Sequence, residues 1–392
     1  MNFTAGNDDS SCRGIFRISW RISLLMEEKG ILLFSLDMEK ALLWCYNIAR
    51  TIKNAILNGR KGVKMLTAEE VKKFAKACGA DICRIGSMDK WEGAPKQMDP
   101  RYIFPDARSI IGLGFRIPRG YLRGIEEGTM FSTYEFMGYS GMNWRYMPHV
   151  LRQIVCFIED HGYEAVPLPN WDAFSYNGYT DYPGKEKKFR SRPVAPGLPC
   201  PDVTISFRVA AAVSNLGEVG WSKMILTPEF GPMVRAVFII TEAELETDPP
   251  ILPGTLCDRC KLCAKMCPGQ AIPMDKSVKF KVGDVEYEHC DLDLARCSNA
   301  YSGGVPEYNP FWDPQYEMED DSYMNEYLSP KYYGSPRGNG GPCPRIMHTR
   351  NNPAIGGGRG CIRACYAHLE AQGKLTHKFV KPFKRHKEWK LD

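Results

Sequence analysis

The sequence predicts an α+β fold, in which a mixed helix-and-sheet domain precedes a small cysteine-rich domain. Two observations carry this prediction. Helical and strand patterns alternate over residues 63–250, and from residue 251 onward the composition shifts to cysteine, glycine, proline and tyrosine. The run TDPPILPG at 247–254 reads as a proline-marked linker between them. We therefore expect two domains, 63–250 and 251–392, after an N-terminal helical extension at 1–62.

The first domain is expected to begin with a helix. Thr67 and Glu70 form a capping box, apolar residues follow at helical spacing, and Gly79 ends the pattern. Apolar stripes predict a second helix that ends at Gly162 and a third near 202–217. The expected strands are 81–86, 109–115, 164–168 and 235–241.

Composition is that of a globular protein with a sizeable core, because 44% of the residues are hydrophobic and 25% are charged. The net charge of +5 is too small to argue for nucleic acid as a partner. The most apolar early stretch, 31–49, carries Asp37, Glu39 and Lys40, so we expect a packing helix there and no membrane span. With no signal-peptide pattern either, the sequence predicts a cytoplasmic location.

The strongest local signal is CDRCKLCAKMCPGQAIP at 257–273. Its four cysteines are separated by two, two and three residues, and a proline follows the last. Three closely spaced thiolates can bind one [4Fe–4S] cube, while the fourth characteristically joins a second cube. A zinc site would favour two separate C-x2-C pairs. The spacing therefore favours iron–sulfur clusters over zinc.

A second cluster requires ligands from further along the chain. Five cysteines follow, one more than needed: Cys290, Cys297, Cys343, Cys361 and Cys365. By the logic of two-cluster ferredoxins, the first cluster takes Cys257, Cys260, Cys263 and Cys365, and the second takes Cys267, Cys297, Cys343 and Cys361. The second set is irregular, because Gly358 stands three residues before Cys361. Glycine runs around these cysteines would let the backbone approach the cluster closely.

Two stretches before the cysteines carry a family resemblance. NLGEVGWSKMILTPEFGPMVR at 215–235 resembles the segment that precedes the clusters in cobalamin-dependent reductive dehalogenases and in epoxyqueuosine reductases. HGYEAVPLPN at 161–170 is similar to a dehalogenase stretch that ends in an active-site asparagine. The order of these stretches and of the cysteine runs also matches. As a combination, these features identify the chain as similar to the corrinoid iron–sulfur reductases.

The resemblance implies a nitroreductase-like domain that binds base-off cobalamin, followed by a ferredoxin-like domain with two [4Fe–4S] clusters. It implies an active-site arginine at Arg235 and an asparagine at Asn170, and Tyr146 and Tyr139 are the candidate proton donors. A charged guanidinium suits an anionic substrate or leaving group. The cofactor-binding residues that the resemblance implies are Asn215, Leu216, Gly217, Met224, Thr227, Pro228, Glu229 and Gly231.

The expected function is a reductase that uses low-valent cobalt to remove a leaving group, such as halide, from a small organic substrate. Three alternatives stay open: epoxide or C–O cleavage on the same cofactors, a non-catalytic electron carrier or activator of corrinoid proteins, and a tRNA-modifying reductase. The aromatic stretch at 301–345 either covers a substrate channel or packs in the core. The basic tail at 377–392 is either solvated or a docking site for an acidic ferredoxin or flavodoxin as electron donor.

Overall fold

A computed structural model describes residues 65–94, 98–169, 203, 205–301, 305–308 and 358–383. All of them belong to one compact unit, Met65–Asp392, so the domain boundary expected near residue 250 remains a prediction. The N-terminal extension, most of the aromatic stretch and the end of the basic tail lie outside the described residues. Within the described ranges, none of the helices combines the length and the apolar character needed to cross a membrane.

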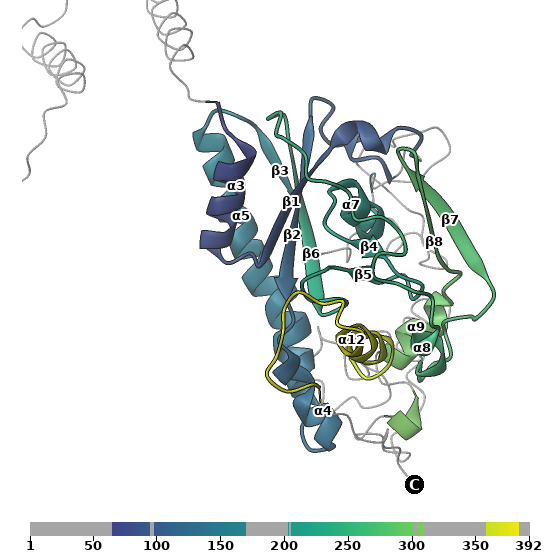
Figure 1. The fold of residues 1–392 in the computed structure, drawn as a ribbon. Coiled ribbons are helices and arrows are strands. Elements are labelled where there is room, and N and C mark those ends of the chain that lie inside the picture. Colours follow the sequence, from purple (N-terminus) through teal and green to yellow (C-terminus); the bar gives the residue numbers. More distant parts are fainter. Residues whose placement is uncertain are drawn as a thin grey trace, which may run out of the picture. The chain divides into compact units, whose positions relative to one another are not determined.

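A four-stranded antiparallel sheet forms the centre of this unit (Figure 1). The strand order is β1 (Ile82–Ser87), β2 (Ser109–Arg116), β6 (Val234–Thr241) and β3 (Ala165–Leu168). All four lie within one or two residues of the predicted strands. The middle strands, β2 and β6, are buried almost throughout because helices cover both faces of the sheet, which explains their nearly continuous apolar sequences.

Helices α3 (Ala68–Cys78) and α5 (Met147–Asp160) cover one face of the sheet, and α7 (Phe207–Val213) covers the other (Figure 1). Side chains of β6 alternate between the two faces, as a pleated strand requires. Val237 packs in the core beneath α3 and α5, whereas Phe238 packs in the core beneath α7. The structure therefore confirms a mixed helix-and-sheet fold.

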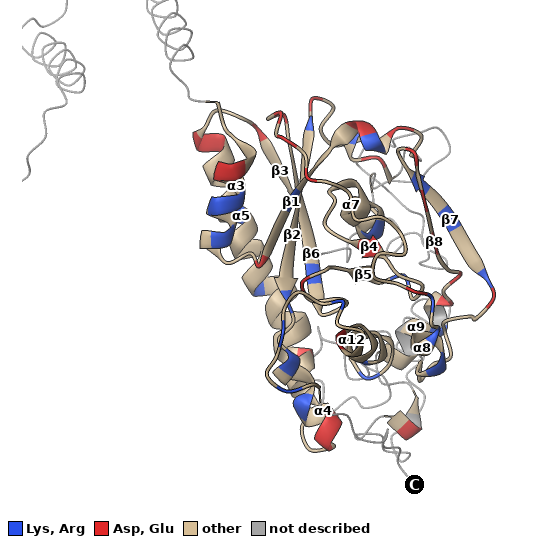
Figure 2. Cartoon of the chain, viewed as in Figure 1, with Lys and Arg blue, Asp and Glu red and all other residues tan. Residues whose placement is uncertain are grey.

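Helix α3 begins and ends as predicted. The Thr67 side chain accepts a hydrogen bond from the Glu70 backbone N–H at 3.2 Å, and the Glu70 carboxylate accepts one from the Thr67 N–H at 3.1 Å. Gly79 ends the helix in the left-handed conformation. Acidic residues occupy the first turn and Lys76 the last turn, which complements the helix dipole (Figure 2).

Two features of this domain differ from the sequence patterns. The third helix is shorter than the predicted 202–217, because Asn215 adopts a left-handed backbone conformation with φ of 60° and α7 ends at Val213. A π-helix, η6 (Tyr134–Tyr146), precedes α5 directly. Its residues show no amphipathic stripe of normal helical period, so the pattern analysis missed it. Such π-helical segments are frequently found at functional sites.

The helices that carry cysteines of the predicted cluster sites lie beyond one end of the central sheet (Figure 1). Two hairpins and several short helices build this region. Their bounds are β4 (Glu218–Val219) with β5 (Ile225–Leu226), β7 (Ser277–Val282) with β8 (Val285–Cys290), η5 (Arg119–Leu122), α4 (Arg123–Glu127), α8 (Leu262–Lys265), α9 (Leu294–Tyr301), η7 (Pro306–Tyr308) and α12 (Cys361–Ala371).

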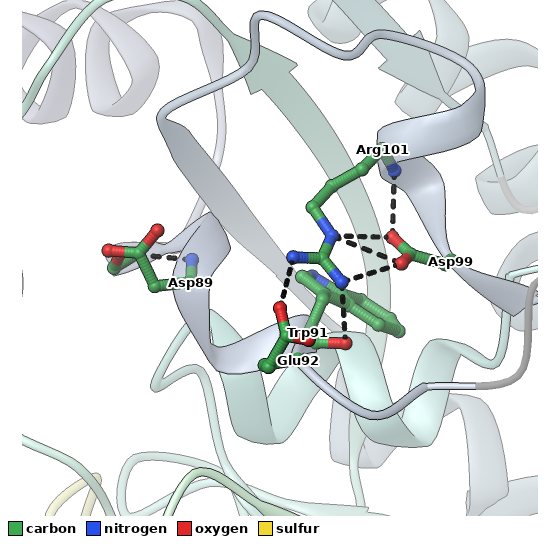
Figure 3. Close-up of polar contacts among 6 residues, drawn as sticks. Asp89, Trp91, Glu92, Asp99 and Arg101 are labelled. Carbon is green, nitrogen blue, oxygen red and sulfur yellow. Dashed lines mark hydrogen bonds and ion pairs between the residues drawn. The ribbon is translucent and has the colours of Figure 1, made fainter.

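Arg101 fastens the long connection between β1 and β2, which contains η2 (Met88–Trp91) and η4 (Pro100–Tyr102) (Figure 3). Its guanidinium donates to both carboxylate oxygens of the buried Asp99 at 2.8–3.0 Å. It also donates to Glu92 at 2.9 Å and to the Trp91 carbonyl at 3.1 Å. One side chain thereby ties both short helices of the connection together.

We expect Arg101→Met to lower the free energy of unfolding by about 2–3 kcal/mol, because it leaves the Asp99 carboxylate buried without its countercharge. A urea titration of the anaerobically purified protein measures this change. Lys279→Met is the control, because the Lys279–Glu286 pair is about half exposed and should contribute less than about 1 kcal/mol. Equal losses in the two variants would contradict the role assigned to Arg101.

Candidate metal centre and active site

The first three cysteines of the 257–273 run lie on a tight loop that leads into α8. Arg259 and Lys261 both adopt positive φ angles, of 58° and 60°. Residues other than glycine rarely take this left-handed conformation, and here it turns the chain twice within three residues. Cys257, Cys260 and Cys263 consequently line the same cavity.

The fourth predicted ligand reaches this cavity from α12. Cys365 lines it together with the three loop cysteines, and the cavity has an empty volume of about 360 Å³. Cys365 is separated from the loop by about a hundred residues of sequence, so tertiary packing of α12 against α8 brings it there. The structure thus gathers all four cysteines that the sequence assigned to the first cluster.

A buried carboxylate holds the start of the cluster loop. Glu218, which is 1% exposed, accepts hydrogen bonds from the backbone N–H groups of Gly254 at 2.8 Å, Leu256 at 2.7 Å and Cys257 at 3.3 Å. Burial raises the pKa of Glu218, while these three donors oppose that rise. Glu218 lies in the 215–235 stretch that carries the family resemblance, but the sequence patterns assigned it no role.

A side-chain brace connects the same loop to α12. The Asp258 carboxylate contacts His368 Nε2 at 2.8 Å and accepts from Gln372 Nε2 at 2.6 Å. Its other oxygen accepts from the Cys260 backbone N–H at 3.1 Å. Because His368 lies one turn beyond Cys365, the brace holds the two ligand-bearing segments in register.

Three of the four cysteines predicted for the second cluster are described, and they lie beside the first group. Cys267 and Cys361 pack against the apolar cluster that contains Cys263. Cys297, on α9, is near enough to both Cys267 and Cys361 for their charges to interact. The fourth predicted ligand, Cys343, lies outside the described residues.

The glycine before Cys361 permits a close approach of two chain segments. A Cβ atom at Gly360 would meet Pro268 Cδ at 2.7 Å, just after the Cys267 ligand position. Only glycine fits so near the neighbouring backbone. This contact brings the start of α12 against the end of the CDRCKLCAKMCP run.

The cysteine chemistry fits an iron–sulfur site. All eleven cysteines in the described ranges are free, so none of these is used for a disulfide. Burial raises the pKa of Cys263 to about 12 and raises that of Cys365 as well. Buried thiols of this kind become thiolates when a metal cation binds them, which couples metal binding to proton release.

The segment expected to contact the corrin forms the β4–β5 hairpin and the turn that follows it. Its polar side chains bind protein groups. Asn215, which is 1% exposed, donates to the carbonyls of Ile85 at 3.0 Å and Asp248 at 2.8 Å and accepts from Lys90 at 2.9 Å. We infer that Asn215 holds the backbone of this segment in place, because its side-chain amide makes these three hydrogen bonds within the protein.

The remaining predicted cofactor residues are placed in the same hairpin. Glu229 pairs with Arg84 at 3.0 Å, and Thr227 caps the turn by accepting from the Phe230 N–H at 3.2 Å. The Met224 sulfur lies 3.6 Å from Cys361 Sγ, which joins this hairpin to the second cysteine group. The other four residues lie along the hairpin and its turn: Leu216, Gly217, Pro228 and Gly231.

Each of the five histidines in the described ranges contacts a protein group. Their contacts are His149 with Gln153, His161 with the Phe157 carbonyl, His289 with the Cys290 carbonyl, His368 with Asp258, and His377 with Arg116.

Arg235 lies at the centre of a group of tyrosines. Its Nη2 donates to the hydroxyls of Tyr134 at 2.9 Å and Tyr301 at 3.2 Å, and its Nε donates to the Gly138 carbonyl at 3.2 Å. The guanidinium carbon also lies 5.0 Å from the centroid of the Tyr139 ring. Three elements, β6, η6 and α9, therefore meet at this one side chain.

The electrostatics of this group keep the arginine charged and the Tyr301 phenol neutral. Burial opposes the charge of Arg235, but the surrounding tyrosines hold its pKa above the ordinary value. Burial raises the pKa of Tyr301 well above its usual value, even though the arginine opposes that rise. The arrangement therefore presents a fixed cation beside a hydroxyl that retains its proton at neutral pH.

The predicted catalytic residues that are described have different surroundings in the structure. It brings Arg235 and Tyr139 together, whereas the Tyr146 hydroxyl donates to the Gly79 carbonyl at 3.1 Å. Asn170 lies outside the described residues. Tyr134 and Tyr301 were missed by the sequence analysis. The only sequence signal for Tyr301 is its position one helical turn after Cys297.

These contacts lead to a prediction about the tyrosines. Tyr134→Phe removes a hydroxyl that contacts Arg235 and should lower turnover at least about tenfold, given that a positioned acid typically contributes 10²–10⁴-fold. Tyr146→Phe is the matched control on the same helix and should stay within about twofold of wild type. Initial rates of the reconstituted protein decide between them, and the reverse ranking would contradict this assignment.

Several known proteins are similar to this chain in sequence, although no family model matches it. Tetrachloroethene reductive dehalogenases are 30% identical over 255 residues in Dehalobacter restrictus and 27% identical over 254 residues in Desulfitobacterium hafniense. Each match covers 59% of this chain and 45% of the relative, so the chain matches less than half the length of these relatives.

Solved structures with similarity to this chain include a reductive dehalogenase from a study of B12-dependent dehalogenation. It is 19% identical, with a TM-score of 0.42, and the match covers 60% of this chain and 29% of that one. Epoxyqueuosine reductase from Bacillus subtilis is 16% identical, with a TM-score of 0.37, and the match covers 74% and 66%. On the strength of the sequence matches, the suspected resemblance is confirmed, and the chain is a relative of the reductive dehalogenases, which are oxidoreductases.

Proposed function

We propose that this chain is a cobalamin- and iron–sulfur-dependent reductase that removes a leaving group, halide in the first instance, from a small organic substrate. The proposed layout is a nitroreductase-like corrin domain at 63–250 followed by a ferredoxin-like domain with two [4Fe–4S] clusters at 251–392. The sequence relationship to reductive dehalogenases supports it over rather more than half of the chain.

The observation that carries this proposal is the gathering of the cysteines. Four of them, from two distant segments, line one cavity, and three more lie directly beside it. Both groups adjoin the hairpin that the resemblance assigns to the corrin: the Trp221 backbone N–H donates to Cys257 Sγ at 3.3 Å, and Met224 contacts Cys361. This arrangement suits electron transfer from the clusters to a cofactor held at the hairpin.

When bound, the cobalamin would supply low-valent cobalt as the reductant, and the clusters would supply its electrons one at a time. The chain's own residues then have two tasks. Arg235 holds a permanent positive charge where an anionic substrate or a departing anion can be stabilised. The tyrosine hydroxyls beside it hold the proton that replaces the leaving group on carbon.

Electrons are proposed to come from a ferredoxin or flavodoxin. Cys260 is exposed to solvent, whereas Cys263 is 8% exposed. An external carrier can therefore approach the first cluster on the side of Cys260.

The test is anaerobic reconstitution with iron, sulfide and hydroxocobalamin, followed by metal analysis and electron paramagnetic resonance (EPR) spectroscopy. Two [4Fe–4S] clusters predict about eight irons per chain, and the cobalt should give the base-off Co(II) signal. Halide release from a panel of organohalides then tests the leaving group. Protein that binds iron and sulfide but no cobamide would contradict the proposal and leave an electron carrier.

A further inference from the structure

Among the described residues, the second cluster has three of its four predicted ligands. Cys267, Cys297 and Cys361 supply three thiols, and a cubane needs four protein ligands. The position three residues before Cys361 is Gly358, which has φ of 85°. A Cβ there would meet Leu122 Cδ2 at 2.6 Å, so the site admits no side chain without rearrangement. The fourth thiolate therefore has to come from a part of the chain other than position 358.

Cys290 lies among the cluster cysteines. It is the last residue of β8 and is 0% exposed. It belongs to the same apolar cluster as Cys263, and the partly buried Cys257, Cys267 and Cys361 pack against that cluster. The first cluster already has its four predicted ligands. The thiol of Cys290 is therefore not needed there and can serve as a ligand of the second cluster.

The backbone around Cys290 is rigidly held. Its N–H donates to the Trp221 carbonyl at 2.8 Å, and its carbonyl contacts His289 Nδ1 at 2.7 Å. It also pairs with Ser277 across the β7–β8 hairpin. Trp221 is itself fixed to the cluster region, because its indole N–H donates to the Pro273 carbonyl at 3.0 Å. Pre-positioned backbone of this kind is typical of metal ligands held in place by surrounding hydrogen bonds.

The electrostatic environment links Cys290 to Cys297 of the second group. Cys290 lies near Cys297, and Lys223 lies near both side chains. Cys290 and Cys297 therefore share one cationic neighbour, as two ligands of the same anionic cluster would.

We propose that Cys290 supplies the fourth thiolate of the second [4Fe–4S] cluster, in the place that the sequence assigned to Cys343. On binding, the Cys290 thiol loses its proton and forms an Fe–S bond, with no change of oxidation state. The inference rests on the proposed two-cluster function. It assigns the β7–β8 hairpin, which the sequence analysis did not foresee, to the metal centre.

The experiment compares Cys290→Ser, Cys343→Ser and Cys83→Ser after anaerobic reconstitution with iron and sulfide alone. Cys83 is the matched control because it is a buried thiol, 7% exposed, in the core beneath α3 and α5. Iron and sulfide contents and the EPR spectrum of the reduced protein are measured. Wild type without iron would refute the proposed function and is thus distinguishable from failure of this inference.

We expect Cys290→Ser to lose the second cluster or convert it to a three-iron form, so that iron falls from about eight to between about four and seven per chain. Retention of the first cluster's signal shows that this variant is folded. Cys343→Ser and Cys83→Ser should keep the wild-type iron content and spectrum.

Two results overturn the inference: a wild-type spectrum for Cys290→Ser, or loss of the second cluster in Cys343→Ser. If Cys290→Ser yields no folded protein, Cys343→Ser decides alone. An intact second cluster there leaves Cys290 as the remaining unassigned cysteine among the five that follow Cys267.

Discussion

Replacing Glu218 with alanine is expected to abolish assembly of the first cluster and to lower the free energy of unfolding by about 3–5 kcal/mol. The carboxylate accepts hydrogen bonds from three backbone N–H groups, the last of which belongs to the ligand Cys257. Alanine leaves these donors without their acceptor, and the Leu256 N–H among them is buried. The loop then has no fixed start, and its three thiols no longer converge.

Iron analysis, EPR and urea titration measure this effect. Glu218→Gln keeps one carbonyl acceptor and should lose less iron than the alanine variant. Glu244→Ala removes an exposed carboxylate that follows β6 and serves as the control, with an expected change within about 0.5 kcal/mol. Full iron content in Glu218→Ala would show that the loop forms without this anchor.

The second large effect is expected at Arg235. Arg235→Met should lower turnover by roughly 10²–10³-fold, as the loss of one preorganised charge-stabilising donor typically does. Arg235→Lys should recover only a small part, because a single ammonium cannot reach both the Tyr134 and Tyr301 hydroxyls as the planar guanidinium does. Iron and cobalt contents should match wild type in both variants.

Arg116→Met provides a matched control for Arg235. Arg116 lies at the same end of the sheet, on the neighbouring strand β2, but its guanidinium contacts His377. Its loss should change turnover by less than about threefold. Wild-type turnover in Arg235→Met would remove this residue from the active site, while loss of cobalt would reassign it to cofactor binding.

Local sequence patterns determined much of the fold. The capping box at Thr67 and Glu70 and the apolar strands were read correctly, because each depends on neighbours within a few residues. The π-helix at Tyr134–Tyr146 and the β7–β8 hairpin were not foreseen. The π-helix spaces its side chains differently from the α-helical period on which the helix predictions were based. Strand β7, with the sequence SVKFKV, does alternate polar and apolar residues, so this signal was present in the sequence and was overlooked.

The candidate site likewise combines features that local sequence predicts with features that depend on tertiary packing. The sequence by itself predicted the kind of metal centre and determined that three thiols lie on one loop, because the spacing of Cys257, Cys260 and Cys263 confines them to a short segment. Only the tertiary structure decided what joins them. Packing of α12 brings Cys365 to the loop cysteines, β8 places Cys290 in the same apolar cluster as Cys263, and Arg235 contacts tyrosines 66 and 101 residues away. Contacts over such separations depend on burial of whole elements against one another, which residue spacing does not encode.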